Sequence, residues 1–100
     1  MDLAPDADAV AVLDLPRHLS TAEGEGLLAD ILERRGHPMT LDAGRVEHLG
    51  ALCLQILLSA ERSWRRDGVA FAVAPRSPGF EEGLARFGIP VERFAGEEAT

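Results

Sequence analysis

The strongest constraint on the fold is the regular alternation of short apolar runs with longer segments of helical periodicity. The apolar runs cover residues 9–15 (AVAVLDL), 38–42 (PMTLD) and 69–74 (VAFAVA). Runs of this length, bounded by turn residues, are typical of strands buried in a sheet. A helical segment follows each run, and this alternation predicts parallel strands joined by right-handed crossovers. We therefore predict an α/β fold with a small mixed, mainly parallel sheet of about four strands and three helices.

The first helix is predicted over residues 20–35. Ser20 and Glu23 have the spacing of a capping box, in which the hydroxyl oxygen accepts from an unpaired helix N–H and the glutamate reaches back. Gly36 predicts the end of the helix, because glycine adopts the left-handed conformation of a helix C-terminus without strain. The apolar positions repeat at helical spacing and predict one inward stripe, made of Leu27, Leu28, Ile31 and Leu32.

The second helix is predicted over residues 50–66 and is apolar on more than one side, as in a helix wedged between a sheet and other elements. Ser77 and Pro78 predict the start of a third helix, as cap and first helical residue, and Gly88 predicts its end. Residues 91–94 are predicted as a short last strand or extended tail. The inward positions of these two helices are Cys53, Leu54, Ile56, Leu57, Leu58, Ala60, Trp64, Phe80, Leu84 and Phe87.

The composition is that of one globular domain. Of 100 residues, 46% are hydrophobic and 27% are charged, which suffices for one core without metals or disulfides. We divide the chain into a flexible N-terminal tail (1–8), a domain (9–94) and an acidic C-terminal tail (95–100). The net charge of −7 argues against nucleic-acid binding, which needs a basic face. The acidic start is unlike a signal peptide, and the longest apolar run (51–58) is too short to cross a bilayer, so we expect a cytoplasmic protein.

The segment that follows the second strand resembles the signature of STAS domains, the anti-anti-sigma-factor-like family. It reads Leu41-Asp42-x-x-x-Val46-x-x-Leu49-Gly50-x-x-Cys53-Leu54-Gln55-x-Leu57-Leu58, a strand ending in a hydrophobic–Asp pair, then a loop and a helix. The flanks agree in order: a first strand and Ser-capped helix, an Arg-Asp-Gly link (66–68) and a Ser-Pro helix start (77–78). The resemblance covers residues 9–94 and implies a STAS-like fold that binds a protein partner.

One departure from the family bears on mechanism. Anti-anti-sigma proteins typically open this helix with Asp-Ser-Ser/Thr-Gly, and a partner kinase phosphorylates the hydroxyl that follows the aspartate. Aligned with that motif, the chain has Gly50-Ala51-Leu52-Cys53. Ala51 stands at the acceptor position and has no hydroxyl, so the alignment implies a member that phosphate does not switch at this site.

The family docks its partners with the loop before the second helix and with that helix. We therefore predict a partner-binding surface along residues 45–55; the alternative is that these residues only close the loop and pack the helix. The same faces could also pair with a second copy as a homodimer. The residues predicted to touch a partner are Arg45, Glu47, His48, Gly50, Ala51, Leu52 and Gln55.

No other constellation predicts chemistry. His18, His37 and His48 are far apart in sequence and lack His-x-x-x-His spacing, so we expect them in loops and not on a metal. Cys53 lies in an apolar helix run and is interpreted as a small buried hydrophobe, not an activated thiolate. Asp42 ends a strand, where acids of α/β active sites can lie, but no second acid, nucleophile or glycine-rich loop accompanies it. We therefore predict no enzyme activity, cofactor or metal.

The resemblance suggests two functions of different classes. The first is a non-catalytic interaction module in bacterial signal transduction, in chemotaxis or anti-sigma-type regulation. Its partner would be a histidine kinase, a chemoreceptor complex or an anti-sigma-like kinase. The Leu-Gly-x-x-Cys-Leu-Gln segment (49–55) resembles serine-less members associated with chemotaxis clusters. The alternative is the cytoplasmic STAS subunit of a phospholipid-trafficking ABC transporter, which binds the ATPase without inserting into the membrane.

Overall fold

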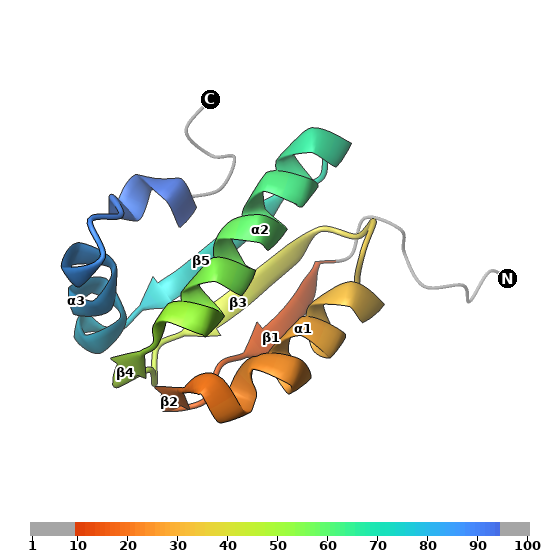
Figure 1. Ribbon diagram of the computed structural model, residues 1–100. Coiled ribbons are helices and arrows are strands. Elements are labelled where there is room, and N and C mark those ends of the chain that lie inside the picture. The colour runs from red at the N-terminus through yellow and green to blue at the C-terminus, as the bar shows by residue number, and fades with distance from the viewer. Residues whose placement is uncertain (1–9, 95–100) are drawn as a thin grey trace, which may run out of the picture.

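The computed structural model describes residues 10–94. In these residues β-strands alternate with three α-helices along the chain, and the strands form two parallel sheets (Figure 1). The larger sheet has the strand order β1-β3-β5, and the smaller one pairs β2 with β4. The predicted α/β class with a mainly parallel sheet is confirmed. The strands are β1 (Ala11–Asp14), β2 (His18–Leu19), β3 (Met39–Ala43), β4 (His48–Leu49) and β5 (Phe71–Arg76).

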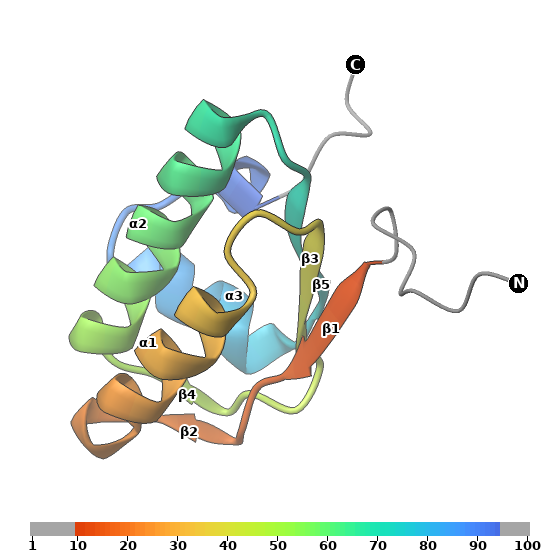
Figure 2. The ribbon, with the colours of Figure 1, turned by 90° about the vertical axis from the view of Figure 1, so that its right-hand side faces the viewer.

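The α-helices all lie on one side of the larger sheet, as Figure 2 shows. They are α1 (Gly24–Glu33), α2 (Ala51–Asp67) and α3 (Pro78–Arg86), with two short 3-10 helices, η1 (Thr21–Glu23) and η2 (Val91–Phe94). Because α1 and α2 each cross between neighbouring parallel strands, they run side by side in the same direction (Figure 1). Their first turns therefore meet at one end of the molecule, next to the smaller sheet.

The predicted start of α3 at Ser77 and Pro78 is confirmed, and α2 ends one residue beyond the predicted position 66. Gly68 ends α2 in the left-handed conformation, with φ of 71°, and its N–H donates to the Arg65 carbonyl at 3.1 Å. The Ser77 hydroxyl oxygen accepts from the Phe80 N–H at 3.0 Å, and Pro78 is the first residue of α3. Both ends follow from local chemistry, since glycine tolerates positive φ and serine satisfies an unpaired helix N–H.

The core lies between the sheet and the helices. Leu41 of β3 and Leu57 of α2 are fully buried in it. Trp64 is also buried, and its indole N–H donates to the His37 carbonyl oxygen at 2.7 Å, which ties the end of α2 to the connection before β3. None of the helices in residues 10–94 has the length and apolar character needed to cross a membrane.

Residues 91–94, predicted as a last strand or extended tail, form the 3-10 helix η2 instead. The helical turn directs Phe94 into the core, where its ring packs at 6.1 Å from the ring of Phe80. In an extended segment, successive side chains point to opposite sides. Such a segment could not bury Phe94 in the core and at the same time let the neighbouring Arg93 reach Glu61 of α2. Burial of an aromatic ring outweighs strand propensity here.

The predicted capping box does not form. Ser20 makes no side-chain hydrogen bond to the helix; its carbonyl oxygen accepts from the Glu23 N–H at 2.9 Å, so the first turn is 3-10 and α1 begins at Gly24. The predicted inward stripe is also too wide. Leu27 and Ile31 are buried, whereas Leu28 and Leu32 are exposed, because α1 lies at the border of the helical layer.

The first apolar run was predicted as a buried strand, but β1 is an edge strand with one open face. Val12 is 62% exposed, because no helix among residues 10–94 covers that side of the sheet. Residue 9 and the predicted tails, 1–8 and 95–100, lie outside the described residues.

Candidate functional site

The smaller sheet anchors the loop that was predicted to bind a partner. His48 is paired with His18 across β4 and β2, and the backbone N–H groups of Glu47 and His48 both donate to the Arg17 carbonyl oxygen, at 2.7 and 3.1 Å. Gly50 N–H donates to the Leu19 carbonyl at 2.9 Å. The prediction that His18 and His48 lie in loops is therefore wrong, because strand pairing brings two segments thirty residues apart in sequence side by side. No sequence signal marks two-residue strands of this kind.

The charged residues of this loop are exposed and weakly paired. Arg45 lies 3.9 Å from Asp14, and Glu47 lies 3.8 Å from Arg17 and 3.9 Å from His18. Exposed pairs of this length contribute at most about 1 kcal/mol each, because water solvates both charges. The pairs can therefore open at little cost, which leaves the charges available to a partner.

The start of α2 is closely packed on one side and open on the other. A Cβ at Gly50, the N-cap, would lie 2.9 Å from the Leu19 carbonyl oxygen, so only glycine fits there without a shift. Ala51, Leu52 and Gln55 are exposed on the first two turns of α2. Six of the seven residues predicted to touch a partner are thus exposed along one end of the molecule, and Gly50 fixes the backbone between them.

An apolar strip that the sequence did not predict continues from this end between α1 and α2. Leu52 is 41% exposed and lies over the start of α1, since a Cβ at Gly24 would come within 2.7 Å of its Cδ2. Leu28 and Leu32, 44% and 54% exposed, carry the strip along α1. A groove of about 100 Å³ follows the strip; its walls include Leu28, Ile31, Leu32, Arg35, Ile56, Ser59 and Ser63. The two leucines were missed because their periodicity was assigned wholly to the core.

Cys53 lies beneath this surface and is not poised as a nucleophile. It is fully buried, and its thiol donates to the Ser20 carbonyl oxygen, with Sγ to O at 3.4 Å. Burial raises the pKa of the Cys53 thiol, and the nearby Glu23 carboxylate raises it further. Both effects disfavour the thiolate, which is the reactive form of cysteine.

The other polar residues considered from the sequence do not assemble into a catalytic or metal group. Asp42 Oδ1 accepts from the Gly44 N–H at 2.9 Å and so shapes the loop that follows β3. His37 lies at the opposite end of α2 from His18 and His48, beside Trp64. Within residues 10–94, no three side chains of histidine, cysteine, aspartate or glutamate are placed to hold a metal ion.

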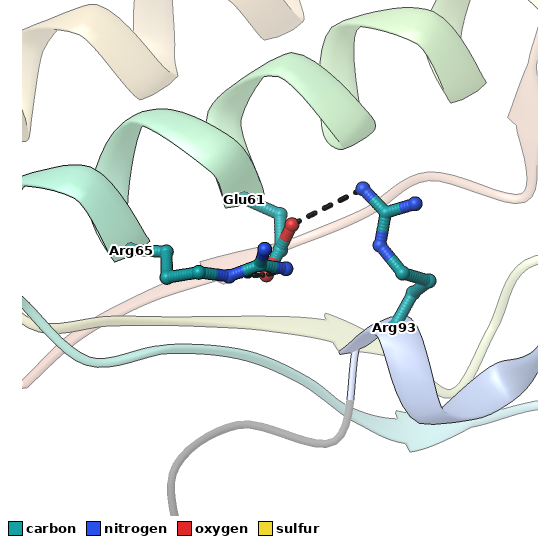
Figure 3. Close-up of polar contacts among 3 residues, drawn as sticks. All are labelled: Glu61, Arg65 and Arg93. Carbon is teal, nitrogen blue, oxygen red and sulfur yellow. Dashed lines mark hydrogen bonds and ion pairs between the residues drawn. The ribbon is translucent and has the colours of Figure 1, made fainter.

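A second polar cluster lies at the far end of α2, around the buried side chain of Glu61 (Figure 3). Arg65 donates to one carboxylate oxygen of Glu61, with Nε at 3.1 Å and Nη2 also in contact, and Arg93 Nη2 donates to the other oxygen at 3.3 Å. A pocket of about 270 Å³ borders the three side chains and also includes Glu92. The charges of the pocket are balanced, so we interpret the cluster as a clamp that fixes η2 on α2.

Comparison of the chain with protein-family models, with curated proteins and with solved structures finds no match. The likeness to STAS domains therefore remains a prediction that rests on the residues quoted above. What the chain does must be inferred from the surface that residues 45–55 and the adjoining strip present.

Proposed function

We propose that the chain is a non-catalytic, STAS-like interaction module in bacterial signal transduction, in chemotaxis or anti-sigma-type regulation. It would bind a histidine kinase, a chemoreceptor complex or an anti-sigma-like kinase through residues 45–55. The observation that carries the proposal is the exposed, mixed surface at one end of the molecule. There, an apolar strip begins at the exposed Leu52, and the exposed charges of Arg45 and Glu47 lie on the loop that leads into the same helix.

Such a surface has the composition of a protein interface. Its centre is apolar, with Leu52, Leu28 and Leu32 exposed, and its rim is charged and wet. Large apolar side chains gathered on one face lower the free energy of binding when a partner removes them from water. The anchoring of the loop to β2 supports the proposal further, because a fixed backbone loses little conformational entropy on binding.

The alanine at the start of α2 supports a module that binds without phosphate control at that position. Ala51 is exposed where the family's phosphate acceptor would stand, and it offers only a methyl group. Phosphate there would add about two negative charges beside the exposed Leu52. A chain without the hydroxyl cannot be switched by phosphate at this position.

The test is affinity capture from extract of the native cells with three tagged baits, read by mass spectrometry. Wild type is compared with Leu52→Glu, which puts a charge on the apolar part of the surface, and with Glu82→Arg, which changes the charge on the exposed face of α3. We expect a kinase, receptor or sigma regulator to be retained by wild type and Glu82→Arg and lost with Leu52→Glu. All baits must show the same far-UV circular dichroism.

Two other outcomes redirect or reject the proposal. An ABC ATPase that is lost in the same pattern would favour the transport accessory predicted as the alternative. If no protein distinguishes wild type from Leu52→Glu, residues 45–55 are not a docking surface and the proposal is wrong.

A further inference from the structure

Among the described residues, the outer edge of β1 carries backbone groups that no strand pairs. Within residues 10–94, β1 pairs with β3 on one side and with no strand on the other. The N–H groups of Ala11 and Leu15 donate to carbonyl oxygens on the β3 side, each at 2.9 Å. Because bonding alternates along a strand of a parallel ladder, the residues at every second position, out of step with Ala11 and Leu15, direct their N–H and C=O groups to the other edge. These residues are Val10, Val12 and Asp14.

The side chains at the first two of these positions do not protect the edge. Val10 and Val12 are 52% and 62% exposed, and alternation along the strand places their side chains on the face opposite Leu13, which packs against the core. Natural edge strands are commonly shielded by charged side chains, by proline or by a bulge, and of residues 10–14 only Asp14, the last of them, is charged. The chemistry that this edge recognises is therefore an extended strand with apolar side chains on one face.

We propose that the strand which occupies the edge is β1 of a second copy of the chain, in antiparallel orientation. The two copies are related by a two-fold axis that is perpendicular to the sheet and passes beside Val12. Val12 of each copy then lies opposite Val12 of the other, and the two residues exchange backbone hydrogen bonds. Val10 of each copy then lies opposite Asp14 of the other. The result is one continuous sheet with the helices of both copies on the same side.

Symmetry and charge both favour a second copy over an unrelated strand. Reciprocal pairing satisfies both open edges at once and gives a closed dimer. The centre of the pairing is neutral and joins valine to valine. The two Asp14 carboxylates are four residues apart in register, or about 14 Å, which is longer than the Debye length in physiological salt. The net charge of −7 on each copy opposes association, so added salt strengthens the dimer.

The decisive experiment is sedimentation velocity of the full chain over a concentration series that reaches the millimolar range. Val12→Pro removes an edge N–H that β3 does not use, and Val12→Lys adds a charge at the centre of the pairing. Leu28→Lys adds the same charge on α1, on the opposite side of the molecule. We expect wild type and Leu28→Lys to dimerise, and both Val12 variants to dimerise at least about tenfold more weakly.

Hydrogen exchange identifies the interface directly. The Val12 and Asp14 amides should gain protection as wild type dimerises, and Val12→Lys, which keeps the backbone intact, should fail to gain it at the same concentrations. A wild-type chain that stays monomeric at every concentration overturns the proposal. So does a dimer that both Val12 variants retain, or one that Leu28→Lys dissociates, since that result would locate the interface between α1 and α2.

Discussion

The contact between α3 and the candidate docking loop can be tested with a single methyl group. A Cβ at Gly79, the second residue of α3, would lie 2.7 Å from the Val46 carbonyl oxygen and 2.9 Å from both Cα and the carbonyl oxygen of Glu47. All three atoms belong to backbone and cannot rotate away. Gly79→Ala must therefore push α3 and the loop apart, which costs about 1–3 kcal/mol, and the better helix propensity of alanine offsets less than about 1 kcal/mol of this.

Gly26→Ala is the matched control, because a Cβ there would meet nothing within 4 Å. It lies in the first turn of α1, so alanine should stabilise the protein by about 0.5–1 kcal/mol through helix propensity alone. Gly24→Ala tests an intermediate case. Its Cβ would meet the flexible end of the exposed Leu52 side chain, which can rotate, so the change in stability should stay below about 1 kcal/mol.

The assay is urea denaturation of the three variants and wild type, supported by thermal melts. The midpoint should fall for Gly79→Ala and rise for Gly26→Ala with the m-value unchanged, because the surface exposed on unfolding stays the same. In a domain of 100 residues, 1 kcal/mol corresponds to about 4–8 °C in melting temperature. A Gly79→Ala protein as stable as wild type would refute the close approach of α3 to residues 46–47.

Four further predictions follow from the core and from the far end of α2. Leu57→Asp should abolish cooperative unfolding in circular dichroism, because an unpaired carboxylate in the core costs several kcal/mol against a total stability of about 5–15 kcal/mol. Trp64→Phe should lower the free energy of unfolding in urea by about 2 kcal/mol, since it leaves the His37 carbonyl without its 2.7 Å donor and opens a cavity; no loss would contradict that bond. Glu61→Ala should destabilise by about 1–3 kcal/mol and Glu61→Gln by less in the same assay, because the alanine variant removes the carboxylate to which both arginines donate. Folding raises the pKa of the Cys53 thiol, so the protonated thiol contributes its full stability below the ordinary thiol pKa, and this stability is lost as the pH rises toward the pKa of the folded protein. Cys53→Ala should therefore reduce the loss of unfolding free energy at alkaline pH. If the dependence of stability on pH is the same in the variant and in wild type, Cys53 does not titrate in this way.

The chain order of the main elements was predictable because it depends on local chemistry. Each element is marked by residues within it or next to it: strands by short apolar runs, helices by helical periodicity, and the start of α3 by the Ser77-Pro78 cap. The alternation of strands with helices then limits the sheet to parallel pairing. The exposure of six of the seven residues predicted to touch a partner was likewise predictable, because a loop between a strand and a helix lies at the surface. Alanine at position 51 excludes phosphorylation of that side chain by its chemistry alone.

The rest depended on which segments meet in space. Periodicity records that one side of α1 is apolar, but only the position of α1 at the border of its layer decides that Leu27 is buried and Leu28 is exposed. The pairing of His18 with His48 and the clamp between Glu61 and Arg93 join residues about thirty positions apart, where no local pattern links them. The sequence by itself thus determined the element order and the chemistry available at each position, because these are local properties. The tertiary structure decided which apolar side chains stay in water and which edge of β1 pairs with β3, because burial and pairing are properties of neighbours in space and not in the chain.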